Sequence, residues 1–182
     1  MKKSIGMIEY RSIAKAIEST DAMLKSANVE LILSNPVCPG KYITLINGEV
    51  GAVESAMKVG KAVGGIFVVD DYIIPNVSEK IFPALSGTTS LDVIGSIGVI
   101  ETMSAVSSII AADIAVKAAN VELIEIRMAR GLGGKGFMTM TGELSSVRSA
   151  VESCEDKLKE SGCIIAAVII ASPTKEVIAS LL

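Results

Sequence analysis

Hydrophobic and polar residues alternate over residues 4–10, and this period of two predicts a β-strand. The next segment, residues 12–27, changes to a helical period and begins with Ser12, a residue type that caps helix N-termini. Its apolar positions at helical spacing are Ile13, Ala16, Ile17, Met23, Leu24 and Ala27. The pattern therefore predicts a strand followed by an amphipathic helix.

The rest of the first half is predicted to form a hairpin, a second helix and a further strand. Pro36–Gly40 interrupts two apolar runs, which is typical of a loop between antiparallel strands. Gly64-Gly65 is expected to end the second helix, because glycine readily adopts the backbone conformation found after helix C-termini. The predicted elements are strands at 29–33 and 42–46, a helix at 49–63, a buried strand at 66–69 and a short helix at 77–85.

The second half of the chain repeats the first. Residues 4–9 (SIGMIE) return as 96–101 (SIGVIE), and residues 27–32 (ANVELI) return as 119–124, both at an offset of 92. The predicted elements are strands at 97–101, 121–128, 137–140 and 164–170, helices at 104–119 and 145–160, and a C-terminal segment from Pro173. We therefore expect an α+β fold of two tandem βαββαβ domains, each an antiparallel sheet with helices packed on it and related to the ferredoxin-like fold.

The repeat also sets the expected domain boundaries. Gly87-Thr88-Thr89-Ser90 is rich in Gly, Thr and Ser and is predicted to be the linker, which gives domains at 1–88 and 94–182. Domains of about 90 residues bury only about 60–65% of their unfolded surface. Half of the residues are apolar although only 3% are aromatic. Each domain is therefore expected to bury apolar surface against its twin or against other subunits.

Charge and composition exclude several classes of function. The net charge is −3 and no block of Lys or Arg occurs, which argues against a nucleic-acid partner. No apolar run is long enough to span a bilayer, and the start lacks a signal-peptide pattern, so we expect a cytoplasmic protein with no membrane partner. The chain has no His, the commonest general base and a common zinc ligand. No nucleophile with a base is evident, and we predict that the protein is not an enzyme.

One loop breaks the repeat and carries the candidate chemistry. The first copy has Val37-Cys38-Pro39-Gly40-Lys41, whereas the second has Gly131-Leu132-Gly133-Gly134-Lys135 with no side chain able to bind a metal. The other cysteines, Cys154 and Cys163, are expected to be small buried apolar side chains. Without CxxC spacing, one chain is not expected to hold an iron–sulfur cluster or zinc alone.

The repeated pattern resembles the bacterial microcompartment (BMC) shell domain family. The resemblance rests on the opening S-I-G-x-I-E, on the Asp21–Val29 segment with Lys25, on the Gly-Lys pair, and on the G-E-[VL] before the second helix. Two such domains with Cys-Pro-Gly-Lys in the first loop resemble the tandem-domain shell proteins of propanediol-utilisation compartments. The resemblance implies a homotrimer with a pseudohexameric shape, packed beside other BMC shell proteins in a compartment shell within the cytoplasm.

The same resemblance implies roles for individual residues. Lys25 and Lys117 match the family's edge lysine and are expected at the contacts between tiles; the alternative is an exposed lysine that complements the helix dipole. The residues expected to line the central pore are Val37, Cys38, Pro39, Gly40, Leu132, Gly133 and Gly134. Three copies of Cys38 about the threefold axis would then be the protein ligands of one [4Fe-4S] cluster per trimer.

The residues around Cys38 are compatible with such a site. Pro36 and Pro39 restrict the loop by fixing φ, and Gly40 allows a tight turn with backbone N–H groups near the sulfur. The cluster would carry electrons across the shell, to or from an encapsulated or cytosolic redox protein, or would itself be transported. Two alternatives stay open. One is a metal-free pore for small metabolites, gated or narrowed by Cys38 and Leu132; the other is a small α+β ligand-binding or regulatory module, or an enzyme, that forms ordinary soluble trimers.

Overall fold

The computed structural model describes residues 4–91, 93–128 and 131–181. It divides into two compact units, one formed by the described residues within Met1–Val77 and Ala129–Gly134, the other by Ser78–Met128 and Lys135–Leu182. Residues 1–3, which begin the first predicted domain, and residues 129–130 in the second loop lie outside the described residues. The domain limits 1–88 and 94–182 stay a prediction.

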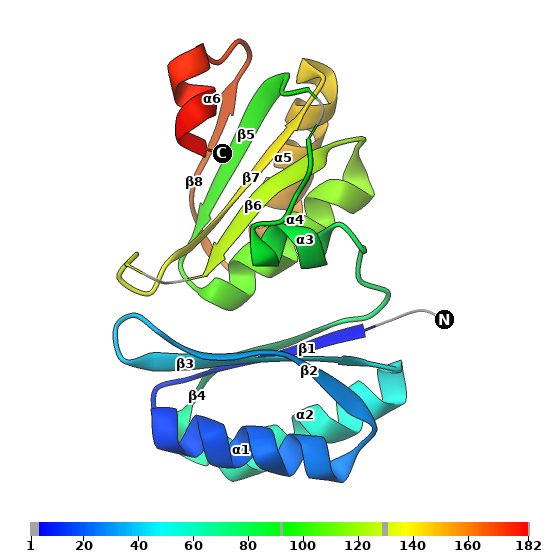
Figure 1. Cartoon of the computed structure of the whole chain (residues 1–182), viewed down its shortest axis with the longest axis vertical. Helices are drawn as coiled ribbons and strands as arrows, with labels where there is room; N and C mark the ends of the chain where they lie inside the picture. The colour runs from blue at the N-terminus through cyan, green and yellow to red at the C-terminus, as the bar shows by residue number, and fades with distance from the viewer. Residues whose placement is uncertain (1–3, 92, 129–130, 182) are drawn as a thin grey trace. The chain divides into compact units, whose positions relative to one another are not determined.

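The first unit is a four-stranded antiparallel sheet with two long helices on one face (Figure 1). Its strands are β1 (Ser4–Tyr10), β2 (Val29–Val37), β3 (Lys41–Gly48) and β4 (Val68–Ile74), in the order β2-β3-β1-β4. The helices are α1 (Ile13–Ser26) and α2 (Val50–Gly64), and a 3-10 turn, η1 (Gly65–Phe67), leads into β4. The core between sheet and helices is apolar and includes Ile8, Met23, Ile46, Val53 and Met57.

The second unit has the same topology, which confirms the predicted α+β fold of two βαββαβ domains. Its strands are β5 (Ser96–Thr102), β6 (Glu122–Met128), β7 (Gly136–Gly142) and β8 (Ile164–Ile170), in the order β6-β7-β5-β8. The long helices are α4 (Ala105–Ala118) and α5 (Leu144–Leu158), and the short ones are α3 (Ile81–Ser86) and α6 (Lys175–Leu181). Although α3 follows β4 in the sequence, it packs on β6 and α4 in the second unit (Figure 1).

Local signals place most of the element boundaries correctly. The Ser12 side chain accepts a hydrogen bond from the backbone N–H of Lys15, so the predicted cap of α1 is confirmed. Gly65 ends α2 with a φ of 50°, a left-handed value that a side chain would disfavour. The strand predicted at Ile66–Val69 exists as β4 but begins only at Val68, and its predicted burial is wrong, since Val69 is 41% exposed. Ile66 is 83% exposed in the turn after α2, because the chain reverses at Gly65 before β4 begins.

Helices α1 and α2 approach each other closely at Gly60. A Cβ atom built on Gly60 would lie 2.5 Å from Met23 Sδ and 2.9 Å from Ile8 Cδ1, both in the core. The contact also joins a buried polar chain, in which Ser19 Oγ donates to the Gly60 carbonyl at 2.8 Å and lies 2.6 Å from Tyr10 Oη. The absence of a side chain at Gly60 therefore sets the spacing of the two helices.

A Gly60→Ala substitution is expected to destabilise the protein by about 1–3 kcal/mol, because the added methyl group overpacks the helix contact. The matched control is Gly51→Ala in the same helix, where an added Cβ would meet nothing within 4 Å. That variant is expected to gain about 0.5–1 kcal/mol from reduced backbone entropy in the unfolded chain. Urea unfolding at one protein concentration measures both, and equal effects at the two sites would contradict the packing argument.

Candidate functional site: the Cys38 hairpin

Cys38 occupies the first position of the three-residue loop that joins β2 to β3. Val37 and Lys41 are paired in the β2–β3 ladder, so the loop consists of Cys38, Pro39 and Gly40. Gly40 has a φ of 72°, the left-handed conformation with which three-residue hairpin loops commonly end. The Cys38–Pro39 peptide bond is cis. The observed loop is shorter than the predicted loop at Pro36–Gly40, because β2 extends to Val37 and includes Pro36.

The glycine loop of the second repeat supplies a hydrogen bond to the Cys38 sulfur. The backbone N–H of Gly131 points at Cys38 Sγ with an N···S distance of 3.4 Å, and residues 131–134 belong to the first compact unit. A Cβ atom on Gly134 would lie 3.1 Å from Pro39 Cδ and 3.4 Å from the Cys38 carbonyl oxygen. The positive φ of 92° also favours glycine at this position. The small residues of this loop therefore allow it to lie against Cys38.

The exposures of the predicted pore-lining residues differ. Cys38 and Leu132 are partly exposed, and Pro39, Gly40 and Gly133 are exposed. Val37 and Gly134 are buried within the chain. Their position at a pore stays a prediction, as do the lattice roles of Lys25 and Lys117. These two lysines lie in the last turns of α1 and α4 and form ion pairs with Asp21 and Asp113, respectively.

A repeated ion pair lies directly behind the hairpin, and sequence reasoning did not anticipate it. Lys41 Nζ lies 2.8 Å from Glu9 Oε1, and the equivalent Lys135 Nζ lies 2.9 Å from Glu101 Oε1. The glutamates lie on β1 and β5. Lys41 and Lys135 come directly after the hairpin loops, and each lies diagonally opposite its glutamate on the neighbouring strand. The signal available in the sequence was the joint repetition of S-I-G-x-I-E and Gly-Lys in both halves.

The two ion pairs differ in burial. The Glu9 side chain is fully buried, and its Oε2 has no hydrogen-bond partner among the described residues. Glu101 and Lys135 are both more than a third exposed. Lys41 is therefore the sole ion-pair partner found in the described structure for a buried carboxylate next to the Cys38 loop.

The other two cysteines lie in the second compact unit, whereas Cys38 lies in the first. Cys154 lies in α5, is fully buried and donates its thiol hydrogen to the Ala111 carbonyl at 3.3 Å, as a structural thiol does. The prediction of burial is wrong for Cys163, which is partly exposed just before β8 and accepts a hydrogen bond from Ser161 Oγ. The described residues contain no group of three or more His, Cys, Asp or Glu that could hold a metal ion.

Burial raises the pKa of Cys154 to about 12, from an ordinary value near 9, with a smaller raising effect from Glu155 and a lowering one from Lys157. The unfolded thiol ionises at lower pH than the folded one, so stability is lost as the pH rises above about 9. The expected slope is about 1.4 kcal/mol per pH unit. Urea unfolding between pH 8 and 10 checks this, and Cys154→Ala should show a shallower loss. Equal slopes for the variant and the wild type would contradict the assignment.

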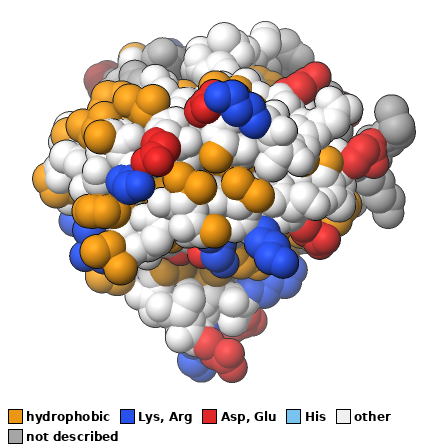
Figure 2. Space-filling view, turned by 90° about the horizontal axis from the view of Figure 1, so that it is seen from below, with side chains coloured by type: hydrophobic (Ala, Val, Ile, Leu, Met, Phe, Trp, Pro, Cys, Tyr) orange, Lys and Arg blue, Asp and Glu red, His pale blue; other side chains and the backbone are white. Residues whose placement is uncertain are grey.

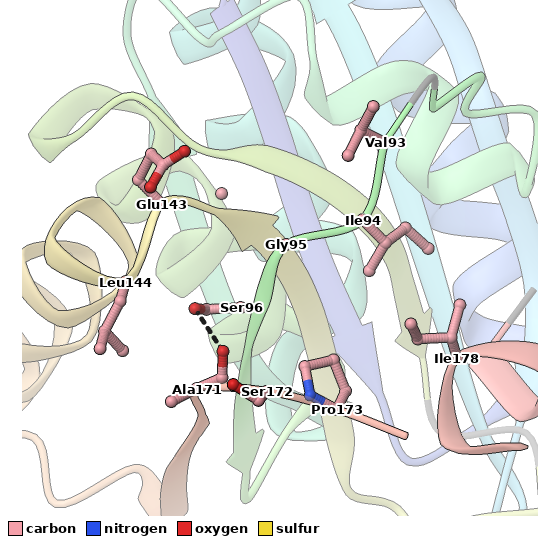
Figure 3. A pocket seen from close by; sticks show the side chains of 11 residues that line it. Val93, Ile94, Gly95, Ser96, Glu143, Leu144, Ala171, Ser172, Pro173 and Ile178 are labelled. Atoms are coloured by element: carbon pink, nitrogen blue, oxygen red, sulfur yellow. Dashed lines mark hydrogen bonds between the residues drawn. The ribbon is translucent and has the colours of Figure 1, made fainter. Parts of the chain in front are cut away.

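The described residues also form an open cleft at the other end of the second sheet, with a volume of about 640 Å³ (Figure 3). It lies between the segment that enters β5, the start of α5 and the Ala171-Ser172-Pro173 turn, and Ile178 of α6 borders it. Ser96 Oγ donates to the Ala171 carbonyl at 2.9 Å and closes one side. Among the described residues that line this cleft, Glu143 is the one charged residue, and a single carboxylate is too few ligands to hold a metal ion.

These features together define a protein built from a duplicated domain in which one of two equivalent loops carries a thiol. The sequence profile of the BMC domain matches residues 4–77 and 96–173. The chain therefore belongs to the BMC domain family and carries the domain twice, which confirms the resemblance found in the sequence. Among the described residues, no helix has the length and apolar character needed to cross a membrane.

Individual relatives agree with this assignment. The bacterial microcompartment shell protein PduT of Citrobacter freundii is 42% identical, over 95% of this chain and 94% of its own length. The shell protein PduA of the same organism is 37% identical over 45% of this chain and 94% of its own length. The crystal structure of a microcompartment protein from Desulfitobacterium hafniense DCB is 45% identical and superposes with a TM-score of 0.92, covering 98% of this chain and 99% of that one. The chain is thus a tandem-domain shell protein similar to PduT.

Proposed function

We propose that this chain forms a homotrimeric, pseudohexameric tile of a bacterial microcompartment shell, in which three Cys38 thiolates hold one [4Fe-4S] cluster at the central pore. The observation that carries the proposal is the asymmetry of the two loops. Cys38 is partly exposed, its sulfur accepts a hydrogen bond from Gly131, and the second loop offers no thiol. Hydrogen bonds to cysteine sulfur are one means by which proteins tune such clusters.

The donor set fits the cluster only in a trimer. Iron–sulfur clusters take thiolate ligands, usually four, and one chain places only Cys38 in this loop. Three symmetry-related copies would leave one iron for an external ligand, while Gly131 and Gly133 add backbone but no competing side chain. When bound, the cluster would supply one-electron transfer, and this chain's residues would hold it, shield it and donate hydrogen bonds to its thiolates.

The role in the shell is structural rather than catalytic. Shell proteins similar over the whole length of the chain support a place in the microcompartment shell beside other BMC proteins. Lys25 and Lys117 would lie at the edges of the tile, where their ammonium groups can meet a neighbouring tile. A redox protein inside the compartment or in the cytosol would exchange electrons with the cluster.

Anaerobic reconstitution of the wild-type protein with iron and sulfide tests the proposal. We expect a sedimentation mass of a trimer, about four iron and four sulfide per three chains, and an EPR signal that appears on reduction. A trimer that stays free of iron would overturn the cluster and favour a metal-free pore for small metabolites. If the whole cluster moves from the protein to an apo-acceptor when the two are mixed, the result would favour cluster transport over electron transfer.

A further inference from the structure

The two repeats differ in the charges that lie behind their hairpin loops. In the first repeat, Asp70 on β4 lies directly opposite Glu9 on β1, so the two side chains share one face of the sheet. In the second repeat, the place opposite Glu101 is taken by Ala166. The ion pair of Glu9 with Lys41 is also the more buried of the two pairs. The repeat that carries the thiol therefore has more charge behind its loop, and that charge is better enclosed.

The charges of the first repeat are ordered across the sheet. The strand order is β2-β3-β1-β4, so Asp70 and Glu9 lie on neighbouring strands, and Lys41 lies at the start of β3, next to the hairpin loop. Lys41 Nζ lies 2.8 Å from Glu9 Oε1, while Glu9 Oε2 has no hydrogen-bond partner among the described residues. Negative charge therefore lies on β1 and β4, and positive charge lies on the side of the loop.

The ammonium group of Lys41 lies beside the contact between the Cys38 loop and the glycine loop. A Cβ atom on Gly134 would lie 3.7 Å from Lys41 Nζ and 3.4 Å from the Cys38 carbonyl oxygen, so both groups border the same small space. The Lys41 side chain is only 24% exposed. Water and salt screen a partly buried charge less than a surface one. The fold therefore holds a weakly screened positive charge next to the backbone of Cys38.

We propose that Lys41 raises the reduction potential of the iron–sulfur cluster that the Cys38 thiolates would hold, and that Glu9 fixes the ammonium group in place. This inference rests on the proposed function and adds two positioning residues to the same site. The net charge around a cluster is one determinant of its potential. The reduced form carries one more negative charge, so a nearby ammonium group favours it. The electron comes from the external redox protein, and no bond forms or breaks.

The two members of the ion pair are expected to act in opposite directions. Lys41→Met removes the positive charge and leaves Glu9 behind, so the potential should fall. Glu9→Gln keeps the shape of the side chain but removes the negative charge that offsets Lys41, so the potential should rise. A role in folding alone does not predict this opposition, because the loss of either partner would disturb the loop in the same sense.

The matched control is Lys61→Met. Lys61 Nζ lies 2.8 Å from Asp71 Oδ2, the same distance as between Lys41 and Glu9. Asp71 follows Asp70 on β4, so its side chain points to the opposite face of the sheet, where the helices lie. Lys61 is 50% exposed, and on the face seen from below basic and acidic side chains are interspersed with apolar ones (Figure 2). Its charge is screened by water, so its removal should leave the potential unchanged.

Redox titration of the reconstituted trimer measures these effects. The wild type and the three variants are loaded anaerobically with iron and sulfide and poised with dithionite in the presence of mediators. The EPR signal of the reduced protein then reports the ratio of reduced to oxidised cluster. At a fixed potential we expect Lys41→Met to lower this ratio about tenfold, which corresponds to 59 mV for a one-electron couple. Glu9→Gln should raise the ratio, and Lys61→Met should match the wild type.

The outcomes separate this inference from the proposed function. A wild-type trimer that takes up no iron overturns the cluster itself. A loaded cluster with the same potential in Lys41→Met, Glu9→Gln and the wild type overturns the role of Lys41 and leaves the cluster standing. Shifts of the same sign in both variants also overturn it. Should Lys41→Met not fold, Glu9→Gln carries the test alone, and an unchanged or lowered potential is then the contrary result.

Discussion

A Cys38→Ser variant is expected to lose at least nine-tenths of the iron and sulfide that the wild-type protein binds after anaerobic reconstitution. The physical reason is that a cluster held by three symmetry-related thiolates loses all of them through one substitution per chain. The hydroxyl of serine is a much weaker iron ligand than a thiolate, because it stays protonated near neutral pH. Iron and sulfide analysis, together with the EPR spectrum of the reduced protein, measures the loss.

The matched control for Cys38 is Cys163→Ser. Cys163 is also partly exposed, but it lies before β8 and accepts a hydrogen bond from Ser161. This variant should keep its full cluster content and its EPR signal. Unchanged iron in Cys38→Ser, or equal losses in the two variants, would refute Cys38 as the ligand while leaving the trimer untouched.

A Lys41→Met substitution is expected to destabilise the metal-free protein by about 3–5 kcal/mol. It removes the ion-pair partner of Glu9, whose side chain is fully buried, and a buried carboxylate without its partner carries a large desolvation cost. The methionine side chain keeps most of the apolar stem of lysine, so the decrease in unfolding free energy reports the missing charge rather than lost packing. Urea unfolding followed by circular dichroism at one chain concentration gives the free energy.

The second repeat provides the control for this experiment. Lys135→Met removes the equivalent partner of Glu101, but that pair is partly exposed, and the expected loss is below about 1 kcal/mol. A double variant, Glu9→Leu with Lys41→Met, should recover much of the lost stability, because removing both charges leaves no buried group without a partner. Similar losses for Lys41→Met and Lys135→Met would contradict the role of burial.

The sequence predicts the repeated topology well because the signals involved are local. Alternation, the Ser12 cap and the glycine pair at the end of α2 each act within a few residues, and the duplication presents every signal twice. Ile66 shows the limit of such signals. A short apolar run is too short to show a hydrophobic periodicity, so the sequence does not reveal whether it is buried. The turn at Gly65 leaves Ile66 exposed to solvent.

The parts of the site that could not be predicted depend on contacts between distant residues. Lys41 and Glu9 are brought together by the register of β1 and β3, which no local pattern encodes. The partner of α3 is equally non-local: its helical pattern predicts the element, but not that it packs on β6 and α4. The hydrogen bond from Gly131 to Cys38 joins the two loops that differ most between the repeats, so the repeat could not suggest it.

The placement of α3 determines where this protein can be divided. A cut within the Gly87-Thr88-Thr89-Ser90 linker follows the sequence boundary, yet it would leave α3 on the first fragment and strip from the second fragment the helix that covers its edge strand. The second fragment would then expose Leu123, and Asp113 would lose its bond from Ser78. A cut before Ser78 would keep the second domain and its covering helix on one fragment. The first domain, already without such a cover, would lose its contact with the glycine loop at 131–134, which hydrogen-bonds Cys38.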